Sequence, residues 1–437
     1  MHLILGFGAT GASFLRYLRK KNIPSIIMDS RKEPPGLAEF NQIDTKNLFL
    51  GRFESSILKK VNTVLVSPGV EFDNEILIKA RSLGIKVLTD LEIFIEESDS
   101  TKLLVTGTNG KTSVVKMLGH VFSNIYEDEK VTCCGNIGKP VLDTLNEGNS
   151  VSVIEVSSFH LEHCESLSSE IGVLLNIDQD HLDRHHSIKN YREIKEKILL
   201  GCKIGLTGVH DLEKRKFKNL KIVNFVDLLE PYQEEISLYL EKQWPSHETL
   251  NVKAVIAIIL AYKFLKNEKS LEKLILDELA LINKCLKCLS SFKRLKHRFE
   301  ILGLQDGITY INDSKSTNIS SLLSALKSSE KLFGPNKTLL LCGGDSKNQD
   351  FSKIQSSSLS SIKRVFIFGK DRERMIEQIG NKVDCSLSES LEDSIKKSYS
   401  FADKGDVLLL SPACSSTDMF LNYEERGEKF RLLSGFK

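Results

Sequence analysis

The chain has 437 residues, of which 41% are hydrophobic and 27% charged, and its formal net charge is +2. These values are ordinary for a globular protein, and the length suggests about three domains of roughly 150 residues each. With 60 basic and 58 acidic residues, no overall charge excess attracts nucleic acid or anionic lipid, so an anionic ligand must be met by a local site.

No segment approaches the roughly eighteen uninterrupted apolar residues of a membrane helix, and the apolar run at 2–5 is too short for a signal peptide. We therefore expect a cytoplasmic protein without nucleic-acid or membrane partners. The nine cysteines are an odd number and are scattered, which predicts reduced, mostly buried thiols. Cys285 and Cys288 have a metal-like spacing, but no second pair lies nearby, which disfavours a zinc site.

The first hundred residues predict an α/β unit with helices between strands at 2–5, 24–28, 63–66 and 85–88. The glycine-rich turn Gly6–Gly11 follows the first strand and is expected to open a helix at Ala12, and Asp29 ends the second strand. Such a turn lets the backbone approach a diphosphate, and the acidic residue can bind sugar hydroxyls or a base edge. A dinucleotide, a nucleotide-sugar diphosphate and a phosphate-free Rossmann-like domain are all compatible with this pattern.

A polar run at 96–100 separates this unit from a second one, with predicted strands at 102–106, 151–156 and 171–176. The first of these strands runs into Gly107-Thr-Asn-Gly-Lys-Thr112, a shortened Walker loop in which Val105 stands at the first glycine position. Backbone N–H groups of such a turn bind phosphates, Lys111 would reach the terminal phosphates and Thr112 would contact magnesium. The alternative is an ordinary strand-to-helix turn.

Polar residues also follow the other two strands of this unit. Glu155 lies at the end of a strand, where phosphate-loop domains place a magnesium ligand. The run Asp178-Gln-Asp-His-Leu-Asp-Arg184 predicts a second metal site, although a surface loop can have the same composition. Lys195 lies in the next helix and, from spacing alone, is expected to be exposed to solvent.

A helical region from 247 to about 290 closes the second unit, and the third unit carries predicted strands at 338–342, 365–368 and 406–410. Three loops rich in hydroxyl, acidic and basic residues follow strands there, at 312–318, 342–347 and 410–418. We call these loops the third-domain rim and expect them to bind an anion, although the first is also compatible with a simple helix start. The serine-rich segment 356–361 is expected to be a loop.

Taken in order, these motifs resemble those of the Mur ligases along essentially the whole chain. The resemblance rests on 107–112, Gly135-Asn-Ile-Gly138, Glu155-Val-Ser-Ser-Phe159, 180–184, Tyr191 to Lys195, His297-Arg-Phe-Glu300, 312–318, 343–347 and 411–418. It implies an α/β protein of three domains: a Rossmann-like UDP-substrate domain at 1–97, a central P-loop-type ATPase domain at 98–294 and a Rossmann-like amino-acid-binding domain at 295–437. It also implies a monomer in the cytoplasm.

Within that family, the resemblance is to the members that add D-glutamate to UDP-N-acetylmuramoyl-L-alanine with ATP, in the synthesis of peptidoglycan precursors. The Asp-Asn-Pro-Arg motif of the diaminopimelate-adding relatives is absent from this sequence. Three other classes of protein share part of this pattern. Folylpolyglutamate synthase lacks the amino-terminal domain, an NAD-dependent oxidoreductase leaves the loop at 107–112 unexplained, and a non-catalytic nucleotide-binding regulator would need neither Lys195 nor the third-domain rim.

The resemblance also implies roles for individual residues. The UDP-linked substrate would contact Ala9, Thr10, Asp29, Ser30, Arg31, Ser67, Gly69, Asn136 and Ser157. ATP would contact Gly107, Thr108, Asn109, Gly110, Lys111, Thr112, Asn251, Arg298 and Asp313. The amino acid would contact Lys315, Thr317, Lys347, Ser416 and Tyr423. Magnesium, expected as two ions, would be held by Thr112, Glu155, His181 and a Lys195 carbamylated by carbon dioxide, and Lys111, His181 and Lys195 would be the catalytic residues.

Three residues depart from the pattern of that family. Glu248 stands where relatives usually have Asn after His247, His160 replaces a usual Gln, and Tyr423 replaces a Phe. We expect these changes to affect adenine binding, a water-mediated metal contact and amino-acid selectivity, respectively. Since the implied ATP residues lie mainly in the middle domain and the amino-acid residues in the third, domain closure is expected to assemble the site.

Overall fold

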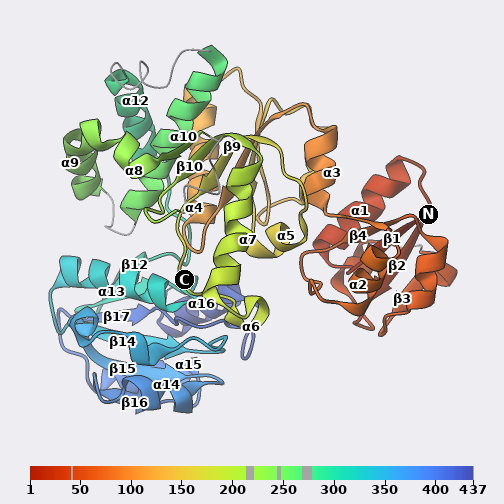
Figure 1. Cartoon of the computed structure of the whole chain (residues 1–437). Helices are drawn as coiled ribbons and strands as arrows, with labels where there is room; N and C mark the ends of the chain where they lie inside the picture. Colours follow the sequence, from red (N-terminus) through yellow and green to blue (C-terminus); the bar gives the residue numbers. More distant parts are fainter. Residues whose placement is uncertain (41–42, 213–220, 244–247, 268–277, 437) are drawn as a thin grey trace. The chain divides into compact units, whose positions relative to one another are not determined.

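The computed structural model describes residues 1–40, 43–212, 221–243, 248–267 and 278–436 (Figure 1). They contain three sheets of five, six and six strands. Contacts along the chain define two compact units, one of residues 1–177, 192–234 and 250–291, the other of residues 178–191, 235–249 and 292–437. The first unit holds the first two sheets and the second unit holds the third.

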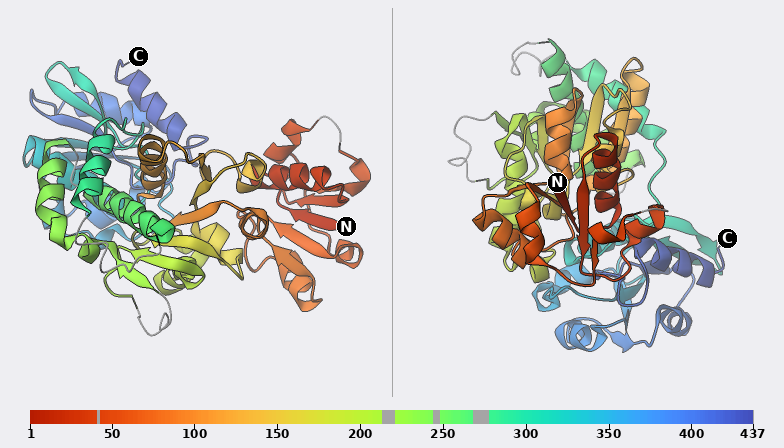
Figure 2. Two further views of the ribbon diagram at one scale, coloured as in Figure 1. Left: turned by 90° about the horizontal axis from the view of Figure 1, so that it is seen from above. Right: turned by 90° about the vertical axis from the view of Figure 1, so that its right-hand side faces the viewer.

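The first sheet is parallel, in the order β3-β2-β1-β4-β5. Its strands are β1 (His2–Leu5), β2 (Ser25–Asp29), β3 (Leu48–Leu50), β4 (Thr63–Val66) and β5 (Lys86–Leu88). The helices are α1 (Ala9–Lys20), α2 (Glu75–Ser82) and α3 (Asp90–Glu97), with short 3-10 turns η1 (Pro35–Glu39), η2 (Thr45–Asn47) and η3 (Ser55–Lys60). Alternate residues of β1 pack on opposite faces, Ile4 with Phe14 of α1 and Leu5 with Ile76 of α2. The sheet is therefore covered on both faces, as Figure 2 shows for the red and orange segment.

Helix α1 begins at Ala9, so the expectation of a helix start at Ala12 was wrong. The reason is the third glycine of the turn, which lies inside the first helical turn. A Cβ atom at Gly11 would lie 2.2 Å from the carbonyl oxygen of Gly6. Without a side chain there, the helix can start against the strand, and the turn stays tight.

The second sheet is also parallel, in the order β11-β10-β9-β6-β8-β7. Its strands are β6 (Thr101–Thr106), β7 (Val131–Gly135), β8 (Val151–Glu155), β9 (Ser169–Leu174), β10 (Cys202–Thr207) and β11 (Ile222–Asn224). The helices from α4 onward are α4 (Lys111–Ile125), α5 (Ser158–His163), α6 (Leu182–His185), α7 (Ile188–Leu200), α8 (Phe225–Leu228), α9 (Gln233–Gln243), α10 (Thr249–Asn267) and α12 (Leu279–Ser290), with η4 (Val141–Thr144) and η6 (Glu230–Tyr232).

Two expectations for this stretch need revision. The strand predicted at 171–176 ends at Leu174, which leaves Asn176 in the following loop. The helical region predicted at 247–290 contains α10 and α12, and its residues 247 and 268–277 lie outside the described part of the chain.

The third sheet has the order β12-β13-β17-β14-β15-β16 and is parallel except for the β12–β13 pair. Its strands are β12 (Glu300–Gln305), β13 (Ile308–Asn312), β14 (Thr338–Gly343), β15 (Ile362–Phe368), β16 (Cys385–Leu387) and β17 (Val407–Leu410). The helices are α13 (Ile319–Phe333), α14 (Arg372–Ile379), α15 (Leu391–Tyr399) and α16 (Tyr423–Leu433), with η9 (Phe351–Lys353) and η10 (Ser356–Leu359). Leu340 packs on the α13 side of this sheet and Leu341 on the α15 side.

The segment expected to be a loop at 356–361 contains the 3-10 turn η10, because Leu359 is buried against the sheet core and draws the serines into a turn. All nine cysteines are free thiols, but Cys133, Cys288 and Cys385 are only partly buried. Among the described helices, none combines the length and apolar composition needed to cross a membrane.

Candidate functional site

The loop at 107–112 has the backbone of a phosphate cradle. It joins the end of β6 to α4, which begins at Lys111. Gly110 has a φ of +86°, in the left-handed region that favours glycine. A Cβ atom at Gly110 would also lie 2.2 Å from Oδ1 of Asn251 on α10. Asn251, which is predicted to contact the adenine, thus packs directly on the loop at Gly110. Only glycine fits at position 110.

Asn176, which follows β9, holds this loop in place. Its Oδ1 accepts a hydrogen bond from the N–H of Asn109 at 2.9 Å, and its Nδ2 donates to the Asn109 carbonyl at 3.1 Å. Its own carbonyl accepts from the N–H of Thr108 at 3.1 Å. We did not single out Asn176 from the sequence. The available signal was its position, because β9 is the parallel neighbour of β6 and the carboxyl ends of such strands meet at one edge.

Two lysines meet at one carbonyl oxygen of the loop. Lys111 Nζ donates to Gly107 O at 2.8 Å and to Thr108 O at 2.9 Å. Lys195 Nζ donates to the same Gly107 O at 2.9 Å and lies 3.4 Å from Thr106 Oγ1. Lys195 is only 1% exposed, so the expectation that it faces solvent was wrong. Its helix, α7, packs over the sheet and buries it, which a helical lysine by itself does not reveal.

Glu155, the last residue of β8, is 2% exposed. Its Oε1 accepts a hydrogen bond from Asn136 Nδ2 at 2.8 Å, and its Oε2 is buried without a hydrogen-bond partner among the described residues. A buried carboxylate oxygen without a partner is costly in a protein, and a bound cation removes that cost. The described residues hold no group of three or more His, Cys, Asp and Glu side chains arranged for a metal. Glu155 therefore remains an expected acidic metal ligand of the first unit, as Thr112 and Lys195 remain the other expected ligands there.

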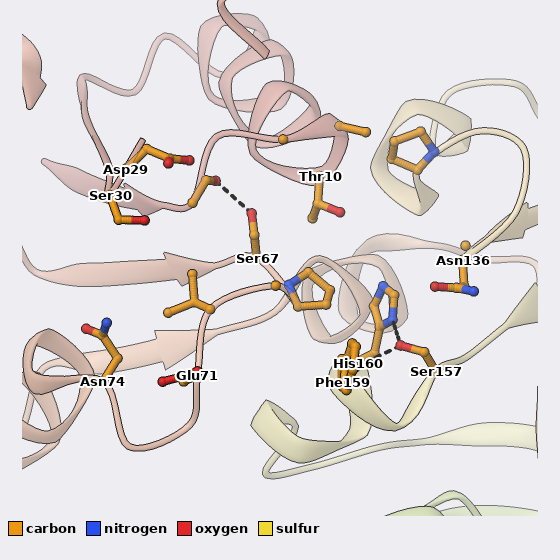
Figure 3. A pocket seen from close by; sticks show the side chains of 18 of the residues that line it. Thr10, Asp29, Ser30, Ser67, Glu71, Asn74, Asn136, Ser157, Phe159 and His160 are labelled. Carbon is orange, nitrogen blue, oxygen red and sulfur yellow. Dashed lines mark hydrogen bonds between the residues drawn. The ribbon is translucent and has the colours of Figure 1, made fainter. Parts of the chain in front are cut away.

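A pocket of about 850 Å³ lies in the first unit, and no residue of the loop at 107–112 lines it. Figure 3 shows side chains from the turns after β1, β2 and β4 on one side and from the segments after β7 and β8 on the other. All nine residues expected to contact the UDP-linked substrate line it: Ala9, Thr10, Asp29, Ser30, Arg31, Ser67, Gly69, Asn136 and Ser157. The structure therefore gathers these nine residues from five separate segments around one cavity. Their binding role remains a prediction.

Asp29 organises one end of this pocket. Its carboxylate accepts from the N–H of Phe7 at 2.6 Å and from the Arg31 guanidinium at 2.7 and 2.9 Å. Burial raises the pKa of Asp29, but the hydrogen bonds from Arg31 and Phe7 outweigh burial and hold the pKa below its usual value. Asp29 is therefore ionised and fixed. Nearby, Ser67 Oγ donates to Gly6 O at 2.7 Å and ties the turn after β4 to the glycine-rich turn (Figure 3).

The other end of the pocket is formed by the start of α5. Ser157 caps this helix, and its hydroxyl is 2.7 Å from Nδ1 of His160. Burial lowers the pKa of His160, against the opposing effect of Asp90 and Glu155, so the imidazole is neutral near pH 7. The cavity is also lined by residues that carried no sequence motif, namely Phe53, Val70, Glu71, Asn74 and Pro140.

In the second unit, the three loops of the third-domain rim follow β13, β14 and β17, which are adjacent in the sheet. Gln349 is fully buried and joins all three loops. Its Nε2 lies 3.0 Å from Ser346 O, 3.1 Å from Ala413 O and 3.4 Å from Thr317 O, and its Oε1 accepts from the N–H of Ile319 at 2.8 Å. Sequence reasoning missed Gln349, because it lies beyond the recognisable motif and its partners are distant in the chain.

The residues expected to bind the amino acid lie in these loops or beside them. Lys315 Nζ is 3.6 Å from the centroid of the Tyr423 ring, a cation–π contact. Ser416 is 4% exposed, and Lys347 forms an ion pair with Asp180 at 3.0 Å. Arg426, another residue that the sequence did not single out, is fully buried and donates to Ser314 O at 2.8 Å and Cys414 O at 3.1 Å. Burial lowers the pKa of Arg426 to about 10, so it stays charged at neutral pH.

Asp313, expected at the ATP site, also belongs to the second unit. Its carboxylate accepts from the N–H of Phe299 at 3.0 Å and from Ser411 Oγ at 2.9 Å. Burial raises the pKa of Asp313 to about 7, although these hydrogen bonds and the charge of Arg298 act in the opposite direction and Glu248 adds to the rise. The predicted ATP residues are therefore divided. The phosphate loop and Asn251 lie in the first unit, and Arg298 and Asp313 lie in the second, together with His181.

Family models match the chain in three consecutive stretches: Mur ligase MurD-like, N-terminal domain, over residues 1–89; Mur ligase middle domain, over 105–229; and Mur ligase, glutamate ligase domain, over 297–414. A UDP-N-acetylmuramoylalanine–D-glutamate ligase from Legionella pneumophila (strain Paris) is 32% identical over 445 residues, which cover 98% of each chain.

Two solved structures from Thermotoga maritima resemble this chain over most of their length. The UDP-N-acetylmuramate–alanine ligase MurC has a TM-score of 0.55 at 17% identity and covers 99% of both chains. The MurF ligase in complex with ADP has a TM-score of 0.54 at 16% identity, over 99% of this chain and 93% of its own.

These likenesses confirm the predicted fold class of three α/β domains and the prediction of an ATP-dependent amide-bond-forming ligase. The alternatives of an oxidoreductase and of a non-catalytic regulator are accordingly wrong. The chain belongs to the Mur ligase family and is an ATP-dependent ligase of peptidoglycan precursor synthesis.

Proposed function

We propose that this ligase adds D-glutamate to UDP-N-acetylmuramoyl-L-alanine, with cleavage of ATP to ADP and phosphate. The observation that carries the proposal is the likeness, over 98% of both chains, to a ligase with that name. The gathering of all nine predicted UDP-substrate residues around one cavity adds support. The folylpolyglutamate synthase alternative does not account for the match of residues 1–89 to the amino-terminal domain of Mur ligases.

The chemistry begins with a carboxylate, which is a poor acyl donor because its leaving group would be oxide. Transfer of the γ-phosphoryl group of ATP to the alanyl carboxylate would give an acyl phosphate, and the amine of D-glutamate would then attack it. The resulting tetrahedral intermediate expels phosphate and leaves an amide bond. No protein nucleophile is needed, so the protein has to position the reactants and stabilise the developing negative charge.

The phosphate loop is suited to that task in the first unit. Lys111, the loop N–H groups and the start of α4 would hold the β- and γ-phosphates of ATP, and Asn251 would contact the adenine. The pocket around Asp29 would hold the uridine diphosphate, with Asn136 and Ser157 lining the path of the muramoyl group. In the second unit, Lys315, Thr317, Lys347, Ser416 and Tyr423 would hold D-glutamate, and Arg298 and Asp313 would complete the ATP site.

Magnesium fits the residues that the first unit presents, since Glu155 Oε2 is buried without a hydrogen-bond partner among the described residues. Glu155, Thr112, His181 and a carbamylated Lys195 would hold it, with two ions expected. When bound, it would neutralise charge on the transferring phosphoryl group.

The carbamate has its own physical support. Two ammonium groups, of Lys111 and Lys195, meet at Gly107 O, and conversion of one into an anion replaces their repulsion by attraction. We expect His181 to be a metal ligand rather than a base.

We further propose the domain limits 1–97, 98–294 and 295–437, and a monomer that works in the cytoplasm. Since the ATP residues are divided between the two compact units, catalysis would require the units to come together around the substrates.

The test is phosphate release from ATP by the purified chain, measured with UDP-N-acetylmuramoyl-L-alanine and one candidate amino acid at a time. Release that depends on D-glutamate, and not on L-glutamate, glycine or L-alanine, is the expected result. Replacement of the UDP-linked substrate by a folate substrate serves as the control for the alternative. Release that is indifferent to D-glutamate would refute the proposal.

A further inference from the structure

The carboxylate of Asp180 joins three segments of the second unit. Its Oδ1 accepts hydrogen bonds from the Lys347 ammonium at 3.0 Å and from the N–H of His181 at 2.9 Å. Its Oδ2 accepts from the Asn318 side chain at 3.2 Å. Only 7% of the Asp180 side chain and 14% of the Lys347 side chain are exposed. Asp180 and Lys347 are thus a largely buried ion pair, in which removal of one partner leaves the other charge uncompensated.

The start of α13 supports the same segment. Asn318 caps this helix, and its side chain accepts from the N–H of Ser321 at 2.9 Å while it donates to Asp180. Ser320 donates to Asp178 Oδ2 at 2.9 Å. The amino-terminal end of a helix of fifteen residues favours negative charge, so both carboxylates lie where the helix stabilises them. The segment before α6 is therefore fixed on α13 by its two aspartates.

The backbone of Lys347 is held separately from its ammonium. Its N–H donates to Asp345 Oδ1 at 3.0 Å, and Asp345 exchanges two backbone hydrogen bonds with Ser415, at 2.8 and 3.1 Å. These contacts fix where the side chain starts, but a lysine has four rotatable bonds and samples many rotamers. Asp180 is the group that fixes the position of the Lys347 ammonium.

We propose that Asp180 is a positioning residue that directs the Lys347 ammonium toward the amino-acid substrate and keeps the third-domain rim in register with His181. The inference rests on the proposed function, which assigns Lys347 to the amino acid. An ammonium carries three N–H groups, and Asp180 takes one, so donors remain for a substrate carboxylate. Asp180 acts through Lys347 and Asn318, and it needs no contact with the substrate itself.

The test uses the full-length chain and three variants, Asp180→Asn, Lys347→Met and the double variant. Asn has the size of Asp and can still accept from the His181 N–H, but it lacks the charge. We expect Asp180→Asn to raise the KM for D-glutamate at least tenfold, with less than threefold change in the KM of ATP and of the UDP-linked substrate. The double variant should be no worse than Lys347→Met, because the two side chains act as one unit.

Asp406 provides a matched control. It is a buried aspartate of the same unit, paired with Lys363 at 2.6 Å and Lys337 at 3.3 Å, and it precedes β17 at the end of the sheet opposite the third-domain rim. Asp406→Asn removes a comparable ion pair, so it should lower stability and leave the KM for D-glutamate unchanged.

Three kinetic outcomes would overturn the inference: an unchanged KM for D-glutamate in Asp180→Asn, an equal rise in all three KM values, or additive effects of the two substitutions. Urea midpoints of the same proteins separate this from a failure of the proposed function. Coupling of Asp180 and Lys347 in stability is expected whatever the substrate, and its absence also counts against the inference. If the variants show this coupling but the wild-type chain shows no D-glutamate-dependent turnover, the proposed function is contradicted instead.

Discussion

Lys195 is a charged side chain in a buried position. Its ammonium shares a carbonyl oxygen with that of Lys111. We expect Lys195→Ala to reduce ligase activity at least a hundredfold, because the anion needed beside the phosphates can no longer form. A short carboxylic acid such as acetate should restore part of the activity by filling the vacated space with a carboxylate.

Lys195→Met is the control for this rescue. Its side chain fills the same space, so added acid should have no effect on its rate. Initial rates with and without the acid, at constant ionic strength, provide the measurement. If Lys195→Ala is as insensitive to acid as Lys195→Met, Lys195 is not carbamylated in the active enzyme.

Asp313 gives a pH dependence whose sign follows from its surroundings. Burial raises its pKa in the folded chain to about 7, from 3.8 when exposed, so between these values the fold binds a proton that the unfolded chain does not. Stability from this group is therefore greatest at low pH and is lost as pH rises toward 7. Relative to Asp313→Asn, the wild type should lose roughly 2–3 kcal/mol of unfolding free energy between pH 5 and pH 7.

A substitution at Glu248 tests the cause of the raised pKa of Asp313. The negative charge of Glu248 adds to the raised pKa of Asp313, so Glu248→Asn should bring the pKa down and make the loss of stability with pH smaller. Urea denaturation of the three proteins at pH 5, 6, 7 and 8 measures the effect. Identical pH profiles of the wild type and Asp313→Asn would show that Asp313 titrates normally.

At the scale of elements, α5 depends on a lysine from another helix. Lys197 of α7 donates to three carbonyl oxygens at the end of α5, of Leu161 at 3.0 Å and of Glu162 and Cys164 at 3.2 Å. A cation at a helix carboxyl end is favourable, and these carbonyls lose their partner in Lys197→Met. We expect a loss of about 1–3 kcal/mol in unfolding free energy.

The same substitution should affect substrate binding, because the start of α5 lines the pocket through Ser157, Phe159 and His160. The KM for the UDP-linked substrate should rise, and the KM for D-glutamate should not. Lys203→Met is the control, since Lys203 is exposed and pairs with Glu170 at 3.3 Å, a surface ion pair that contributes little to stability. Equal effects of the two substitutions would contradict a special role for Lys197.

At the scale of the whole molecule, the predicted substrate contacts are divided between the two units. The nine UDP-substrate residues lie in the first unit and the five amino-acid residues in the second. We expect Asp29→Asn to raise the KM for the UDP-linked substrate about tenfold or more and to leave that for D-glutamate within threefold, because it loses the charge that fixes Arg31. Lys315→Met should do the reverse. Steady-state rates with each substrate varied in turn measure this, and a rise in the same KM for both variants would contradict the division.

Much of the fold could be predicted from local patterns. The central strands of each sheet are apolar runs, and the predicted strands at 63–66 and 85–88 fall on β4 and β5 to within a residue. Several strands were not predicted: β7, β10, β11, β12 and β13, and the short edge strands β3 and β16. Strands β3 and β16 have three residues each, all half-buried, so no continuous apolar run marks them. Helix starts were less accurate, as the early start of α1 at Ala9 shows, since caps and close packing at glycine decide them.

Features that depend on local conformation could be predicted from the order of residues alone. The turns at 6–11 and 107–112 need glycine, because the backbone there is left-handed or lies too close to neighbouring atoms for a side chain. The order of the motifs along the chain indicated the family. Which distant side chains meet depends on how the folded elements pack. The burial of Lys195, the hydrogen bonds of Gln349 to three loops and the pairing of Asp180 with Lys347 each join segments far apart in the chain. Neither spacing nor periodicity encodes such contacts, because they arise only when separate elements pack against one another.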